Sequence, residues 1–314
     1  GQGHWAHPVK LEPTMKHHRT ARIAALALGL ALSGPTVAAP RDFQGLAVEV
    51  RGEGRPVLMI PGLNSPASVW DDTCAALQAD GVACHLVQLP GFAGHAALAD
   101  ASDETGFLQP MRDRLLAYVA HAGLDKPAVA GHSLGGVLAL MMAIESPASV
   151  GPLLIVDSLP FFPAAMNAQA TAQTMRPMAE SMRAGMRAQT DEDYAVQARA
   201  QAGMGMSNDA ARTARIQDWT GASDRETTTR AMFDMFSTDL RPQLDQVRSP
   251  TLVLGAWAAY APMGSTLDST RGIFEAQYAT LPGVRIEMSE AGYHFLMFDD
   301  LDWLLGNARS HLLK

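Results

Sequence analysis

The feature that most constrains the fold is residues 128–136, where a short apolar segment ends in Gly-His-Ser-Leu-Gly. A long apolar segment, residues 137–144, follows directly. This order predicts a buried strand, a sharp turn and a helix, with Ser133 at the tip of the turn. Gly131 and Gly135 stand two positions to either side, where a side chain would prevent the turn from closing. We therefore predict that Ser133 is a nucleophile; the alternative is a glycine-rich turn with an incidental serine.

Short apolar segments alternate with helix-favouring segments along much of the chain. Strands are expected at residues 43–51, 57–60, 82–89, 128–131, 153–156, 251–255 and 284–288. Most of these segments are almost wholly apolar, which is typical of a parallel sheet buried on both faces. Helices are expected at residues 69–77, 107–122 and 273–281. The strand, helix, strand order predicts an α/β fold class with a doubly wound, mostly parallel sheet in one domain.

One long segment, residues 158–249, interrupts this alternation and contains no convincing strand. Helices are expected there at residues 164–186, 193–201, 209–219 and 227–236. The segment holds nine of the 17 methionines, a flexible residue type that can line an adaptable apolar pocket. Ordinary helix packing explains any single methionine equally well. We predict a core formed by residues 40–157 and 250–314, with residues 158–249 inserted as a helical cap.

The Gly-His-Ser-Leu-Gly turn resembles the nucleophile turn of α/β hydrolases, and the resemblance extends from about residue 43 to the C-terminus. Three further stretches resemble parts of that family: residues 61–64, 89–92 and 291–294. The resemblance implies that His294, in a loop after the last expected strand, is the base that activates Ser133. Histidine suits this role because its ordinary pKa lies near neutrality. His132 is expected to point away from the serine.

The resemblance also implies where the negative charge of the reaction would be bound. The backbone N–H groups of Leu63 and Leu134 are the expected donors of an oxyanion hole. Pro61 stands where many relatives have histidine. Asn64 could add a side-chain contact to the substrate, but a role in the turn that it begins is equally compatible with the sequence.

The acid that orients the base departs from the common family pattern. Relatives usually carry an aspartate in the loop after the penultimate strand, but here residues 256–261 contain no carboxylate. Asp157, which directly follows an expected strand, is the favoured replacement, although it could serve only to cap a turn. Asp268 is the next candidate, and a site with no acid is the third possibility. Trp257 and Tyr260 in the vacated loop are expected either to line the substrate pocket or to pack under the cap.

Residues 1–39 are expected to lie outside the fold. Residues 1–14 precede Met15 and resemble an upstream extension. Basic residues, a short apolar run and small residues follow at about residues 15–39, which indicates a signal peptide and a periplasmic or secreted protein. The apolar run is shorter than the roughly 20 residues of a membrane-spanning helix, so a retained anchor is the minor alternative. In an oxidising compartment Cys74 and Cys84 could form a disulfide, while two buried thiols are equally compatible.

Charge and composition narrow the function further. The net charge of −8 at pH 7 makes nucleic acid an unexpected partner. No cysteine or histidine spacing indicates a metal site, and no cofactor is implied. The sequence therefore predicts an exported serine hydrolase that cleaves a small to medium hydrophobic carboxylic ester through an acyl-enzyme, without stable membrane insertion. The alternatives are hydrolysis of an amide, peptide or carbon–carbon bond, or a non-catalytic homologue that binds a ligand.

Overall fold

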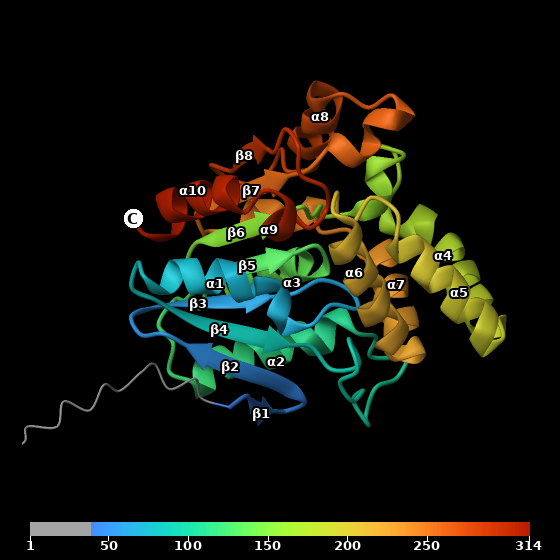
Figure 1. Ribbon diagram of the computed structural model, residues 1–314, viewed down its shortest axis with the longest axis horizontal. Helices are drawn as coiled ribbons and strands as arrows, with labels where there is room; N and C mark the ends of the chain where they lie inside the picture. Colours follow the sequence, from blue (N-terminus) through green and yellow to red (C-terminus); the bar gives the residue numbers. More distant parts are fainter. Residues whose placement is uncertain (1–38) are drawn as a thin grey trace, which may run out of the picture. The chain divides into compact units, whose positions relative to one another are not determined.

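An eight-stranded sheet organises the computed structural model, which describes residues 39–314 (Figure 1). The strands are β1 (Arg41–Phe43), β2 (Leu46–Arg51), β3 (Arg55–Ile60), β4 (Val82–Gln88), β5 (Ala128–His132), β6 (Leu153–Val156), β7 (Thr251–Gly255) and β8 (Arg285–Met288). Their order in the sheet is β1-β2-β4-β3-β5-β6-β7-β8. Strand β2 runs antiparallel to β1 and β4, and the other neighbours pair in parallel. The predicted mostly parallel α/β fold is therefore confirmed.

Helices pack on both faces of this sheet. They are α1 (Asp71–Gln78), α2 (Leu108–His121), α3 (Leu134–Glu145), α8 (Leu267–Gln277), α9 (Leu296–Asp299) and α10 (Leu301–Leu312). Successive strand residues belong to different apolar clusters: Leu153 and Ile155 pack with α2 and α3, whereas Leu154 and Val156 pack with α1 and α10. Side chains alternate along a strand, so a four-residue apolar run serves both faces at once.

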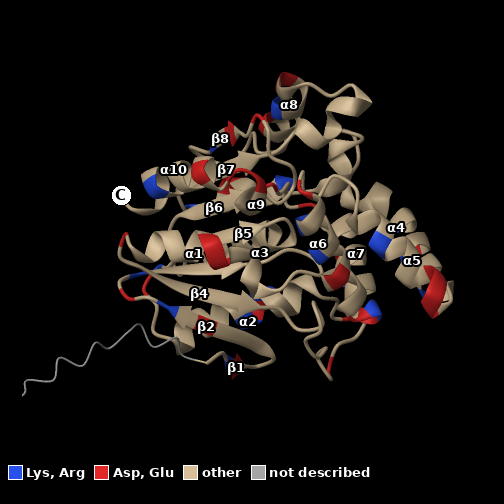
Figure 2. Cartoon of the chain, in the orientation of Figure 1, with Lys and Arg blue, Asp and Glu red and all other residues tan. Residues whose placement is uncertain are grey.

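Between β6 and β7 the chain forms four longer helices and no strand. These are α4 (Ala172–Ala188), α5 (Asp191–Ala202), α6 (Ala210–Ala222) and α7 (Arg225–Ser237). Each begins after a threonine or aspartate whose side chain accepts a hydrogen bond from the backbone three residues on. We call α4–α7 the cap helices. Figure 2 shows charged residues on them, while the ribbon of β5 and β6 carries none.

Two expected helices begin at different residues from those predicted. The helix expected from residue 164 starts at Ala172, because Thr171 and Thr174 form a reciprocal cap there. The helix expected at residues 273–281 starts earlier, at Leu267, because Thr266 and Ser269 form the same kind of cap. The first prediction relied on helix-favouring composition and the second on the alternation of strands and helices, and both overlooked the threonine cap at the first turn.

The methionines of the cap helices and their loops do not share one environment. Met166 and Met178 are 89% and 57% exposed, so these two side chains face solvent and line no enclosed pocket. Met175 and Met235 instead pack against apolar clusters. The pocket expected from methionine content is therefore not formed by the segment as a whole.

A disulfide joins Cys74 of α1 to Cys84 of β4, so the alternative of two buried thiols does not hold. The expected upstream extension and nearly all of the expected signal peptide lie outside the described residues. Within residues 39–314, no helix has both the length and the apolar character needed to cross a membrane.

Candidate active site

Ser133 sits at the tip of the turn between β5 and α3, in a strained backbone conformation. Its φ and ψ angles are 53° and −120°, which residues other than glycine rarely adopt. A side chain at Gly131 would collide with the backbone of Gly135, and one at Gly135 would collide with the backbone of Ile60. The turn is held by Ser158, whose hydroxyl donates to the carbonyl oxygen of Ser133 at 2.7 Å. The two flanking glycines are therefore required by close backbone contacts.

The structure brings His294 and Asp157 together. The distance from His294 Nδ1 to Asp157 Oδ2 is 2.6 Å. An Nδ1–H group that donates to the carboxylate leaves Nε2 unprotonated and able to accept a proton. The alternative acid, Asp268, lies on the exposed first turn of α8 and makes no hydrogen bond to His294 within residues 39–314.

The position of the acid follows from the order of the strands. Asp157 directly follows β6, and its φ of 43° turns the chain sharply. Its Oδ1 accepts a hydrogen bond at 2.9 Å from the backbone N–H of Ala256, the first residue after the neighbouring strand β7. The loop after β7 thus supplies a backbone donor that orients the carboxylate of Asp157.

The loop after β3 passes directly beside the nucleophile. A Cβ placed on Gly62 would lie 3.1 Å from the Cβ of Ser133 and 3.2 Å from Nδ1 of His132. Among the described residues, the backbone N–H groups of Leu63 and Leu134 have no hydrogen-bond partner. The N–H of Leu134 also opens helix α3, where the helix dipole favours negative charge. Two free donors therefore border Ser133 from two separate elements.

His132 lies behind His294 and is fully buried. Its Nε2 is 3.0 Å from the backbone oxygen of His294, and the centroids of the two rings are 4.6 Å apart. Burial, with a smaller contribution from the nearby His294, holds the pKa of His132 well below its usual value. A neutral His132 can donate through Nε2 to the backbone oxygen of His294 and so holds the backbone of the base. The position of His132 next to Ser133 in the sequence did not predict this contact.

Three residues expected near the substrate lie in different surroundings. Asn64 is 7% exposed, and its Oδ1 accepts from the hydroxyl of Thr228 in α7 at 2.7 Å. Its φ of 56°, within a turn closed from Ser65 N to Gly62 O, favours the turn role.

Trp257 packs against the apolar core on one face of the sheet. Tyr260 is 43% exposed, and both partial burial and the charge of Asp157 raise the pKa of its hydroxyl. Trp257 therefore serves packing, and the side chain of Tyr260 stays partly exposed to solvent.

Two aspartates that the sequence analysis overlooked hold the loop that contains His294. Asp300 accepts from the hydroxyl of Ser289 at 2.6 Å, and that hydroxyl in turn accepts from the backbone N–H of Gly292 at 2.9 Å. Asp299 accepts from the backbone N–H of Tyr293 at 3.1 Å. The only sign of this role in the sequence is the pair of adjacent aspartates after the His294 loop. The sequence does not indicate which groups they bind.

The fold and these contacts define a class of protein. The sequence model of the alpha/beta hydrolase family matches residues 57–306. The chain therefore belongs to the alpha/beta hydrolase family.

Esterases are among its relatives. It is 35% identical over 116 residues to a pimeloyl-[acyl-carrier protein] methyl ester esterase of Vibrio atlanticus, a match that covers 37% of this chain and 41% of the relative. The corresponding enzyme of Nitrosomonas europaea is 30% identical over 115 residues, with 37% and 42% covered. The matches thus span about two fifths of the length of these curated relatives.

A solved structure shows the same fold over most of the chain. The esterase from Exiguobacterium antarcticum superposes with a TM-score of 0.68 at 14% identity, covering 86% of this chain and 96% of that one. At this identity the likeness concerns the fold alone. Family membership and esterase relatives together support a hydrolase.

Proposed function

We propose that this protein hydrolyses carboxylic esters through an acyl-enzyme formed on Ser133. The observation that carries the proposal is the 2.6 Å contact of His294 Nδ1 with Asp157 Oδ2, beside the strained turn that presents Ser133. A serine hydroxyl is a weak nucleophile unless a base removes its proton, and an oriented histidine is that base. The esterase relatives support the choice of an ester as the bond that is cleaved.

In the proposed reaction Oγ of Ser133 attacks the ester carbonyl carbon while its proton passes to Nε2 of His294. The negative oxygen is bound by the N–H groups of Leu63 and Leu134. The carbon–oxygen bond to the alcohol breaks, and the alcohol takes the proton from His294. Water then attacks the acyl group, giving a second proton to His294 and releasing the acid, and the proton returns to Ser133. Asp157 keeps His294 in the required tautomer throughout.

The proposed substrate is a small to medium hydrophobic ester. Phe295, which packs against His294 with ring centroids 5.6 Å apart, and Leu63 in the turn beside Ser133 support an apolar environment next to the reacting groups. We also propose that the protein is exported, with a signal peptide at about residues 15–39. The Cys74–Cys84 disulfide supports this, because disulfides persist mainly in oxidising compartments.

The proposal is tested by turnover of a series of p-nitrophenyl esters of increasing acyl length, with the matching anilides for amide hydrolysis. We expect the wild type to cleave the esters, and Ser133→Ala to lose a factor of about 10⁵–10⁶ in kcat. Asp268→Asn, the matched control for the acid, should keep wild-type rates. Undiminished ester turnover by Ser133→Ala would contradict the mechanism, and faster cleavage of anilides than of esters would reassign the bond.

A further inference from the structure

Among the hydrogen bonds of residues 39–314, one joins the turn that contains Leu63 to the cap helices. The turn spans residues 62–65 and is closed by the hydrogen bond from Ser65 N to Gly62 O at 3.3 Å. Asn64, one of its two central residues, adopts a left-handed φ of 56°. Asparagine tolerates this conformation better than most residues, but it is still less favourable than an ordinary one. The turn therefore depends on contacts that hold Asn64.

Thr228 supplies that contact. Its hydroxyl donates to Asn64 Oδ1 at 2.7 Å across 164 residues of sequence, and it also lies 3.0 Å from Asp224 O, one turn back in its own helix. The contact with Asn64 is the shorter of the two, and Thr228 and Asn64 are only 4% and 7% exposed. Within residues 39–314 this is the only hydrogen bond to the Asn64 side chain. A buried amide oxygen that loses its donor is strongly disfavoured, so the pair favours the observed conformation.

Helix α7, which contains Thr228, is itself anchored to the core at both ends. At its start the backbone N–H of Asp224 donates to Gly91 O at 2.7 Å. Near its end Asp234 accepts from the backbone N–H groups of Phe107 and Leu108, at 2.7 and 2.9 Å, and so caps α2. These hydrogen bonds hold α7 in place on the core, and with it the position of Thr228 next to Asn64.

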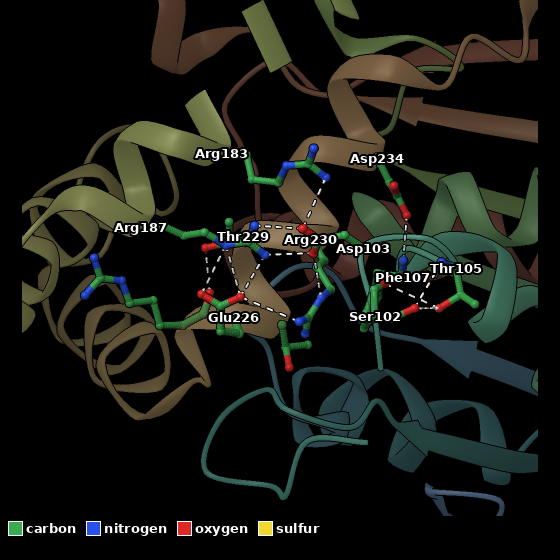
Figure 3. A network of polar contacts seen from close by, with 12 residues as sticks. Ser102, Asp103, Thr105, Phe107, Arg183, Arg187, Glu226, Thr229, Arg230 and Asp234 are labelled. Atoms are coloured by element: carbon green, nitrogen blue, oxygen red, sulfur yellow. Dashed lines mark hydrogen bonds and ion pairs between the residues drawn. The ribbon is translucent and has the colours of Figure 1, made fainter. Parts of the chain in front are cut away.

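A network of charges ties α7 to its neighbour α4 and to the loop before α2 (Figure 3). Asp103 of that loop binds Arg187 of α4 at 2.7 Å and Arg230 of α7 at 3.1 Å. Arg187 also contacts Glu226 of α7 at 2.8 Å. The position of α7, and with it Thr228, is therefore fixed by groups on both the core and the rest of the cap helices.

We propose that Thr228 is a positioning residue through which the cap helices set the geometry of the oxyanion-binding turn. By holding Asn64 it keeps the Gly62–Ser65 turn, and the N–H of Leu63 within it, in one arrangement beside Ser133. The inference rests on the proposed function. It implies that the contact affects the chemical step more than substrate binding, because an oxyanion forms only during the reaction.

The test compares Thr228→Val, which removes the donor at nearly constant volume, with Thr228→Ser, which keeps it. Thr229→Val is the matched control, because Thr229 is also buried and donates only to Arg225 O of its own helix, at 2.7 Å. We expect Thr228→Val to lower kcat about 10–100-fold with KM changed less than about threefold. Binding of a boronic acid that mimics the tetrahedral intermediate should weaken by the same factor. Thr228→Ser and Thr229→Val should stay near wild type.

Asn64→Gly provides a second variant, since glycine accepts the left-handed conformation but has no oxygen for Thr228. The double variant with Thr228→Val should lose no more activity than the worse single variant, because both changes remove one interaction. Additive losses would overturn the inference, as would equal kcat values for Thr228→Val and Thr229→Val in an active enzyme. A wild type that neither turns over esters nor differs from Ser133→Ala would instead overturn the proposed function.

Discussion

The core and the cap helices of this protein are stabilised by different forces. In the core, strands β4, β5, β6 and β7 consist entirely of buried residues. In the cap helices, α5 contains no buried residue and α4 contains one, Ala179. In α4 and α5, ion pairs and side-chain caps replace apolar burial, as at Asp103 and Arg187 in Figure 3. Helix α7 differs from these two, because it buries Ala231 and Phe233.

The core and the cap helices also contribute different residues to the candidate site. Ser133 and Asp157 stand at the ends of buried neighbouring strands, where close packing fixes them within a narrow range of positions. The cap helices and their loops instead touch the surrounding loops: Thr228 binds Asn64, and Met206 O accepts from Phe295 N at 2.9 Å. The core therefore positions Ser133 and Asp157, whereas the loop between α5 and α6 also holds His294, whose backbone N–H donates to Gly205 O at 3.3 Å.

The largest expected effect comes from the core end of the site. Asp157→Asn should lower kcat about 10³–10⁴-fold, because His294 loses the carboxylate that fixes its tautomer and stabilises its protonated form. Steady-state kinetics on the best ester measures this loss. Asp268→Asn is the control, and similar activity in both variants would move the acid away from Asp157.

Packing of the core is tested at a glycine. Gly135→Ala should destabilise the protein by about 3 kcal/mol or more, because the new Cβ would collide with the backbone oxygen atoms of Ile60 and Pro61. Gly185→Ala in α4 is the matched change in the cap helices, where a Cβ meets nothing within 4 Å. It should be neutral or stabilise by about 0.5–1 kcal/mol, since alanine favours helix. Urea unfolding measures the free energy of unfolding of both variants. Equal losses would contradict the expected difference in packing between the core and α4.

A smaller effect concerns the buried His132 and pH. Its pKa lies well below the usual 6.5 in the folded protein, so the unfolded chain binds more protons as the pH falls below 6.5. Lowering the pH in that range should therefore lower the free energy of unfolding, by up to about 1.4 kcal/mol per pH unit for this one group. His132→Phe should remove this share of the slope in urea unfolding between pH 5 and 7. If the free energy of unfolding of His132→Phe depended on pH as in the wild type, the pKa of His132 would not be lowered in the folded protein.

The smallest effect on global stability is expected at Asp103, whose side chain is 40% exposed. Asp103→Asn should change the free energy of unfolding by less than about 1 kcal/mol, because exposed ion pairs contribute little. Hydrogen exchange in α4 should nevertheless become faster, and 1 M salt should speed it in the wild type too. Asp113→Asn, which breaks an exposed pair with Arg112 in α2, is the control. Global unfolding of Asp103→Asn would show instead that the whole fold depends on the ion pairs of this aspartate.

The sequence predicted the core better than the cap helices, for a physical reason. Strands such as residues 153–156 are apolar because both faces of the sheet are buried. Four consecutive apolar residues are enough to indicate such a strand. The serine turn was also visible, because the local pattern places a glycine on either side of Ser133. Gly131 meets the backbone of Gly135, whereas the contact of Gly135 with the backbone of Ile60 is not local. The first turns of α4 and α8 depend on reciprocal caps between two hydroxyl side chains, which helix-favouring composition does not reveal.

Among the contacts between distant residues, the sequence favoured only that of His294 with Asp157, on family resemblance, and it left Asp268 open as an alternative. The choice between Asp157 and Asp268 as partner of His294 depends on β6 lying beside β7, so that Ala256 N can bind the Asp157 carboxylate. The pair Thr228 and Asn64 lies 164 residues apart and has no local pattern. Residue type indicated the candidates, and only the tertiary fold brought partners together.

The most direct test of the central claim maps the residue that a fluorophosphonate probe modifies, by mass spectrometry of the intact protein and its peptides. The account predicts one adduct, on Ser133, that is absent in Ser133→Ala, forms about 10³-fold more slowly in Asp157→Asn and is unchanged in Asp268→Asn. An adduct on another residue, or equal labelling rates in the wild type and Asp157→Asn, would contradict it.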